Sequence, residues 1–129
     1  EDLYRLSRSL DDVIDNLGDF TTELERYGAE PNERFARPLD ALARGLSELE
    51  SAIRQLGGDV QSATAAARAA KHANEARAAY HDGMSDLLHG DKVTMDTLRQ
   101  RELLRRLDVT GLRLNEAADA LASGLLKRR

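Results

Sequence analysis

The sequence predicts an all-α protein, an antiparallel up-down bundle of four long helices that forms a single domain over residues 1–129. Three observations support this prediction. Alanine, leucine, arginine and glutamate, which favour helices, are abundant, whereas aromatic residues make up only 4% of the chain. Apolar residues recur at steps of three and four, the spacing of one helix face. Helix-ending signals stand at three places, residues 28–32, Gly57 with Gly58, and Gly90, and these places divide the chain into four segments.

The first two helices are predicted at residues 2–27 and 32–56. The segment from Gly28 to Asn32 separates them, and Gly57 and Gly58 end the second helix. Pro38 either kinks the second helix or is the first residue of its regular part. The apolar stripes are Leu3, Leu6, Leu10, Val13, Ile14, Leu17, Phe20, Leu24 and Tyr27 in the first helix, and Phe35, Leu39, Leu42, Leu46, Leu49, Ile53 and Leu56 in the second.

The third helix is predicted from a cap at Asp59 to about Leu88, with Gly90 as the signal that ends it. Its centre is rich in alanine, which favours a helix that packs closely on its neighbours. The fourth helix is predicted from a cap at Asp91 or Thr94 to about residue 126, a length of about 50 Å at 1.5 Å per residue. Because the connections are short, successive helices are expected to run antiparallel.

Composition and charge exclude several classes of protein. The chain has no cysteine, which excludes disulfides and thiolate metal sites. A net charge of −4 is not that of a generally basic nucleic-acid binder. No run of about 18 apolar residues is present, so no span of a membrane is expected, and no signal peptide is visible. Residues 1–30 hold nine acidic and three basic residues, and residues 91–129 hold nine basic and six acidic ones, so the two segments have complementary charge if they pack together.

Asp11, Asp15 and Asp19 recur at every fourth residue of the first helix. This spacing places the three carboxylates within about 80° of one face, away from the apolar stripe. Like charges at this spacing cost about 0.2–0.5 kcal/mol per pair, and aspartate is a poor residue inside a helix. The row is either a solvated acidic face that a stable bundle tolerates or a cation site. A cation site would need further oxygen ligands from other helices.

Other chemistry-bearing residues give weaker signals. The three histidines, His72, His81 and His89, lack the spacing of a ligand pair on one helix face, and we expect them to be exposed. No phosphate-binding loop, nucleophile elbow or Ser-His-Asp set is present, so no enzyme is expected. A basic cluster follows residue 98 and is expected either to form ion pairs within its helix, near Glu102, or to dock onto an acidic protein loop or an anionic membrane surface. The cluster consists of Arg99, Arg101, Arg105 and Arg106.

Three segments of the chain resemble the PhoU-like family. The string EDLYRLSRSLDDVID, from Glu1 to Asp15, resembles the family's third helix, most closely in the branch that accompanies low-affinity inorganic phosphate transporters. Asn74-Glu75-Ala76 with Tyr80 resembles its fifth helix, and residues 102–127 resemble its last. The resemblance covers the whole chain and matches it to the last four of six family helices. It implies a C-terminal fragment of a longer protein, and the missing initiator methionine is consistent with that expectation.

The resemblance also implies a metal site. Family members bind iron or zinc on the bundle surface through an acidic residue followed four positions later by aspartate. Asp11, Asp15 and Asp19 match the first such motif. An offset of 97 residues places Asp108 and Glu116 in the second motif, where Leu112 replaces the middle acid and Arg77 replaces an acid of the fifth helix. The implied metal ligands are therefore Asp11, Asp15, Asp19, Asp108 and Glu116, for Fe or Zn, with Mg or Mn as alternatives.

The function implied is that of a non-enzymatic regulator or accessory protein of inorganic phosphate transport. It would contact a phosphate transporter or its regulator in the cytoplasm, at the inner face of the membrane, with peripheral membrane contact and no nucleic-acid partner. A four-helix part of a six-helix fold would expose core surface, so a homodimer is expected. The alternative is a structural helical adaptor that oligomerises through its apolar faces and holds no metal.

Overall fold

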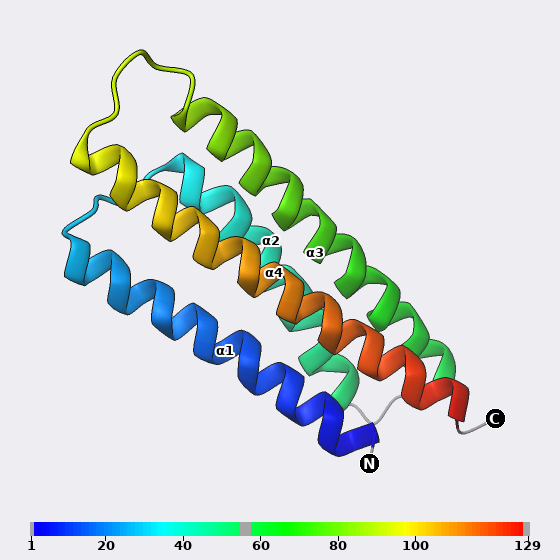
Figure 1. The fold of residues 1–129 in the computed structure, drawn as a ribbon. Helices are drawn as coiled ribbons and strands as arrows, with labels where there is room; N and C mark the ends of the chain where they lie inside the picture. The colour runs from blue at the N-terminus through cyan, green and yellow to red at the C-terminus, as the bar shows by residue number, and fades with distance from the viewer. Residues whose placement is uncertain (1, 55–57, 128–129) are drawn as a thin grey trace.

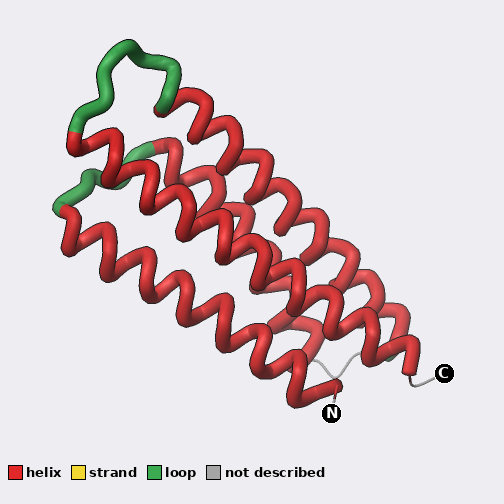
Figure 2. Tube along the Cα trace, in the orientation of Figure 1, coloured by secondary structure: helices red, strands yellow, loops and turns green. Residues whose placement is uncertain are grey.

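Four long α-helices make up most of the computed structural model, which describes residues 2–54 and 58–127. They are α1 (Asp2–Tyr27), α2 (Glu33–Arg54), α3 (Asp59–Leu87) and α4 (Met95–Lys127). Successive helices run antiparallel (Figure 1), and the described residues contain only helices and their connecting loops (Figure 2). The predicted all-α, up-down bundle of four helices is therefore confirmed. The predicted end of the second helix at Leu56 lies outside the described residues.

A Schellman motif ends α1. Gly28 has a positive φ of 64°, a conformation that glycine adopts without steric cost. Its amide donates to the carbonyl of Glu25 at 3.1 Å, and the amide of Ala29 donates to the carbonyl of Leu24 at 3.1 Å. Leu24 and Ala29 also pack against the core, so the chain leaves α1 in a fixed direction towards α2.

The starts of α3 and α4 differ from each other. The N-cap of α3 is Gly58, which makes no side-chain capping bond. Asp59 was predicted as this cap, but it is the first residue of the helix. Thr94 caps α4, as one of the two predicted alternatives. Its hydroxyl accepts from the amide of Thr97 at 3.2 Å, and the hydroxyl of Thr97 accepts from the amide of Thr94 at 3.2 Å. This reciprocal arrangement satisfies two amides that the helix leaves unpaired.

The helix α4 is the central element of the bundle. It packs along α1 on one side, along α3 on the other, and more lightly against α2, which packs along α3. The main contact of α1 is with α4, and α1 and α2 do not pack closely along their lengths in the described residues. They meet through Phe20 and Phe35, whose rings lie edge to face with centroids 5.6 Å apart. The bundle is therefore three tightly packed helices with α1 laid on α4.

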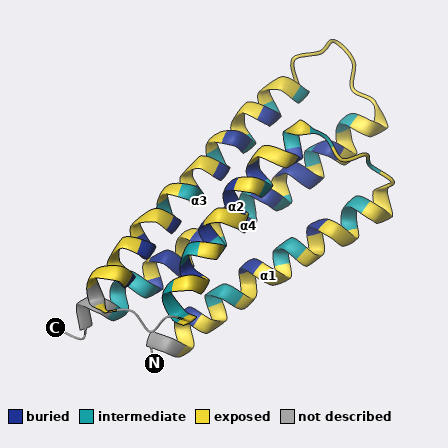
Figure 3. Ribbon diagram, turned by 180° about the vertical axis from the view of Figure 1, so that it is seen from behind, coloured by how far each residue is buried: buried dark blue, intermediate teal, exposed yellow. Residues whose placement is uncertain are grey.

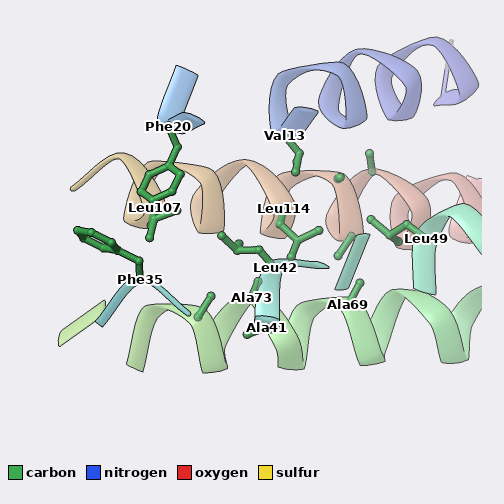
Figure 4. Packing of buried hydrophobic residues seen from close by; sticks show 14 of the residues in the cluster. Val13, Phe20, Phe35, Ala41, Leu42, Leu49, Ala69, Ala73, Leu107 and Leu114 are labelled. Carbon is green, nitrogen blue, oxygen red and sulfur yellow. The ribbon is translucent and has the colours of Figure 1, made fainter. Parts of the chain in front are cut away.

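Large aliphatic side chains fill the core between α1, α2 and α4, as Figure 4 shows. Each fully buried leucine stabilises the fold by about 1.5–3 kcal/mol relative to an exposed one. The helix α3 contributes alanines to the same core, and these bury little area but let the backbones approach. The side chains that are at least 98% buried include Phe35, Leu42, Leu49, Leu103, Leu104, Leu107 and Leu114.

Gly45 of α2 shows how closely α2, α3 and α4 pack, and Pro38 shows where α2 begins. A Cβ atom on Gly45 would lie 2.5 Å from Cδ2 of Leu114 in α4 and 3.2 Å from Cβ of His72 in α3, so a side chain has no room there. Pro38 is buried inside α2, whose helix begins at Glu33. Its predicted alternative role as the first residue of the regular helix is therefore wrong, because the residues from Glu33 onward are already helical.

Exposed residues cover the outer faces of the helices in Figure 3. A few large apolar side chains are among them, including Tyr4 and Ile14 on α1 and Val60 on α3. Within residues 2–54 and 58–127, no helix has the length and apolar character needed to cross a membrane.

Candidate functional site

The acidic row of α1 lies on the surface, as its spacing predicts. Asp11, Asp15 and Asp19 are all exposed, whereas Leu6, Val13 and Phe20 on the opposite face are buried. In the described part of the chain, no basic side chain lies within salt-bridge distance of Asp11 or Asp15. The row is therefore an anionic strip that solvent or a partner can reach.

Arg106 of α4 connects the row to the body of the protein. Its Nε and Nη2 donate to Oε1 of Glu23 at 3.0 and 2.6 Å, and its Nη1 donates to Oδ1 of Asn16 at 3.2 Å. The same Nη1 lies 3.8 Å from Oδ2 of Asp19, so the end of the acidic row shares this guanidinium. Because the Glu23 side chain is only 20% exposed, the Arg106–Glu23 pair is the stronger of the two ion pairs. The complementary charge predicted for the two ends of the chain is thus realised between α1 and α4.

The other three arginines of the predicted basic cluster form no ion pair in the described part of the chain. Arg99 and Arg105 are exposed, and Arg101 is partly buried with its Nε unpaired. Among the described residues, none of the four arginines lies within salt-bridge distance of Glu102. The expectation of ion pairs within the helix is therefore wrong for Arg106, whose partners are on α1. Sequence reasoning missed this role, and the only signal for it was the opposite charge of the two segments.

The two predicted ligands on α4 are both engaged by arginines. Oδ1 of Asp108 accepts from Nε of Arg77 in α3 at 3.1 Å, and the Asp108 side chain is only 20% exposed. Oε1 of Glu116 accepts from Nη1 of Arg113 at 2.8 Å, within the same helix. Asp108 therefore faces α3, on the side of α4 opposite α1, and Glu116 is on an exposed part of α4.

The five predicted ligands do not come together within one chain. Asp11, Asp15 and Asp19 are on the outer face of α1, and Asp108 is on the far side of α4. In the described residues, no three His, Cys, Asp or Glu side chains lie close enough to hold a metal ion. These carboxylates, as this chain places them, do not fit a metal cluster of the kind that the resemblance implies. Metal binding stays a prediction that awaits measurement.

The histidines occupy three different environments. His89 lies exposed in the α3–α4 loop, and His81 is exposed beside Tyr80, with ring centroids 5.0 Å apart. His72 differs from the prediction because its side chain is only 18% exposed, next to the tight α2–α3 contact. Its Nδ1 lies 3.1 Å from Oε2 of Glu75, one turn away. This local pair orients the imidazole on the edge of the bundle.

Comparison of the chain with protein-family models, with curated proteins and with solved structures finds no match. The resemblance of α1, α3 and α4 to the PhoU-like family is therefore supported by the residues quoted above and by no independent relative. The geometry of the described residues presents an acidic helix face, an interhelical arginine anchor and a packed core.

Proposed function

We propose that this protein is a non-enzymatic regulator or accessory protein of inorganic phosphate transport, which acts by contact with the transporter or its regulator. The observation that supports the proposal most is the string from Glu1 to Asp15, in which the resemblance to the phosphate-transport branch is most specific. Residues 2–15 of this string lie on α1, and the aspartates at positions 11, 12 and 15 are exposed while Leu6 and Val13 are buried. A partner could therefore contact the acidic residues without disturbing the core.

The contact surface that we propose is the acidic row of Asp11, Asp15 and Asp19 with the neighbouring Asp12. Four carboxylates on one helix give a negative strip that steers and orients a partner with basic residues. The strip stands on α1, which packs mainly on α4 and so leaves its outer face open. In this proposal the binding free energy comes from partner arginines or lysines, and no step depends on a metal.

Phosphate uptake tests the proposal directly. Cells that lack the gene would be complemented with the wild type, with Asp11, Asp15 and Asp19 changed together to asparagine, or with a control. The matched control removes the same charge from exposed acids elsewhere, through the combined changes Glu30→Gln, Asp91→Asn and Asp119→Asn. We expect uptake of radioactive phosphate to respond to the wild type and the control but not to the row variant. Equal uptake with and without the gene would refute a role in phosphate transport.

A second candidate function is a structural helical adaptor that holds no metal. The observation that favours it is the engagement of Asp108 by Arg77 and of Glu116 by Arg113, which leaves these predicted ligands already paired. Elemental analysis of protein purified without chelators tests the metal-free character of this second candidate. An adaptor would contain no stoichiometric Fe, Zn, Mn or Mg, and none of these ions would raise its melting temperature.

A further inference from the structure

The helix α1 is attached to one side of a unit that the other three helices form. Each of α2, α3 and α4 packs against the other two, whereas α1 packs along α4 and meets α2 at the contact of Phe20 with Phe35. In Figure 1, α1 lies at the edge of the bundle beside α4. The helices α2, α3 and α4 therefore have a shared core that does not require α1 for its closure.

The side chains of α1 are less deeply buried than those of this three-helix unit. Among the described residues, the largest side chains with less than 2% exposure come from α2 and α4, apart from Val13. Leu6 and Phe20 of α1 are each 4% exposed, and its other core-facing leucines are only partly buried. Because the cost of separating two elements rises with the apolar area between them, removal of α1 costs less than opening of the three-helix unit. The partly buried leucines are Leu10, Leu17 and Leu24.

A polar network fixes the chain directly after the α1–α2 loop. Oε1 of Gln100 in α4 accepts from Nδ2 of Asn32 at 3.2 Å and from Nη1 of Arg34 at 2.9 Å. Nε of Arg34 also donates to Oδ2 of Asp86 in α3 at 2.7 Å. Gln100 is only 9% exposed, and its Nε2 donates to Oδ2 of Asp96 at 2.7 Å. These contacts tie the start of α2 to α3 and α4 and involve no residue of α1.

Residues 28–31, between α1 and this network, have the properties of a hinge. Gly28 has a φ of 64° and, as a glycine, tolerates other backbone conformations at little cost. Glu30 and Pro31 are exposed, so of the four residues only Ala29 packs against the core. A hinge consists of a few loop residues that absorb a change in backbone angles. The chain can therefore turn here while the polar network holds α2 in place.

We propose that α1 undocks from α4 as a unit while α2, α3 and α4 stay folded, with residues 28–31 as the hinge. The hydrogen bonds of Arg106 with Glu23 and Asn16 break in this step. Because helices in proteins are stabilised mostly by packing, the undocked α1 loses much of its helical structure. The acidic row moves with α1, and the face of α4 towards which Val13 and Phe20 point in Figure 4 becomes accessible. This device does not rest on the proposed role in phosphate transport.

Hydrogen exchange of the backbone amides, followed by NMR in dilute urea, tests the proposal. We expect the amides of Val13, Leu17 and Phe20 to exchange through one common opening. Their exchange should be faster, by about tenfold or more, than that of the most protected amides of α3 and α4, which exchange when the whole chain unfolds. Equal protection of α1 and the other helices would overturn the proposal.

Two variants separate undocking from global unfolding and from local fluctuation. Arg106→Met removes the polar fastening, so it should accelerate exchange at Val13 and Phe20 by the same factor, about tenfold or more. Ala78→Gly weakens α3 at an exposed position and touches no contact of α1. It should accelerate exchange of the protected α3 amides about threefold to fivefold and leave the α1 amides unchanged.

The outcomes of these variants decide between the alternatives. Equal acceleration of the α1 and α3 amides by Ala78→Gly would show that all four helices unfold together, and would overturn the proposal. Exchange at Val13 and Phe20 that Arg106→Met leaves unchanged would overturn it too, because local fluctuation of α1 would then account for the exchange. Circular dichroism checks that both variants fold.

Discussion

The Arg106 side chain is predicted to fasten α1 to the rest of the bundle, and the variant Arg106→Met tests this. The guanidinium donates two hydrogen bonds to Glu23, a third to Asn16, and lies within 3.8 Å of Asp19. Methionine keeps an apolar stem of similar length, so the variant removes mainly the charge and the donors. The contacts with α1 that remain are apolar, along the α1–α4 interface.

The loss of stability expected for this variant depends on how deeply the carboxylates of Glu23 and Asp19 are buried. The Glu23 side chain is 20% exposed, so without its partner it loses charge-assisted hydrogen bonds that are worth about 1.5–3 kcal/mol. Asp19 is 60% exposed and farther away, and solvent screens such a pair to about 0.3 kcal/mol or less. We therefore expect Arg106→Met to lower the free energy of unfolding by about 2 kcal/mol, which is about 8 °C in melting temperature for 129 residues.

Urea denaturation of a double-mutant cycle measures each pair separately. The cycle of Arg106→Met with Glu23→Gln should give a coupling energy of about 1 kcal/mol or more, and the cycle with Asp19→Asn should give a value near zero. Added salt should change the Glu23 coupling little, because partly buried pairs are weakly screened. Equal coupling energies for Glu23 and Asp19 would refute the reasoning, since burial would then not decide the strength of these pairs.

Three further predictions concern other parts of the bundle. Gly45→Ala should lower the free energy of unfolding by about 1 kcal/mol, because its Cβ would meet the buried Leu114 at 2.5 Å. Gly18→Ala is the control in the same urea titration. It should raise the free energy of unfolding by about 0.5–1 kcal/mol, because a Cβ there meets nothing within 4 Å and alanine favours a helix more than glycine does. Thr94→Ala should cost about 1 kcal/mol by removing the cap of α4, with Thr94→Ser as the variant that retains stability. Asp15→Ala should raise the metal-free melting temperature slightly by relieving repulsion, and should abolish any metal-dependent rise of the wild type; a metal-dependent rise that survives in this variant would exclude Asp15 as a ligand.

Much of the local structure was predictable because it depends on neighbouring residues. The end of α1 followed from Gly28, and the start of α4 was placed at one of two predicted caps, Thr94, because a glycine's conformational freedom and a threonine hydroxyl act within one turn. Asp59 was the wrong choice of cap for α3, because aspartate is also stable in the first helical position beside the positive end of the helix dipole. The exposure of the acidic row followed from the helical period alone.

The sequence by itself determined four helices, their antiparallel order and the surface position of Asp11, Asp15 and Asp19, because helix propensity, periodicity, helix ends and short loops are local properties. Only the tertiary structure decided which helices pack together. It placed α1 on α4, turned Arg106 to Glu23, and paired Asp108 with Arg77 across the α3–α4 contact. These partners are far apart along the chain, and their choice depends on how the side chains of all four helices fill one core.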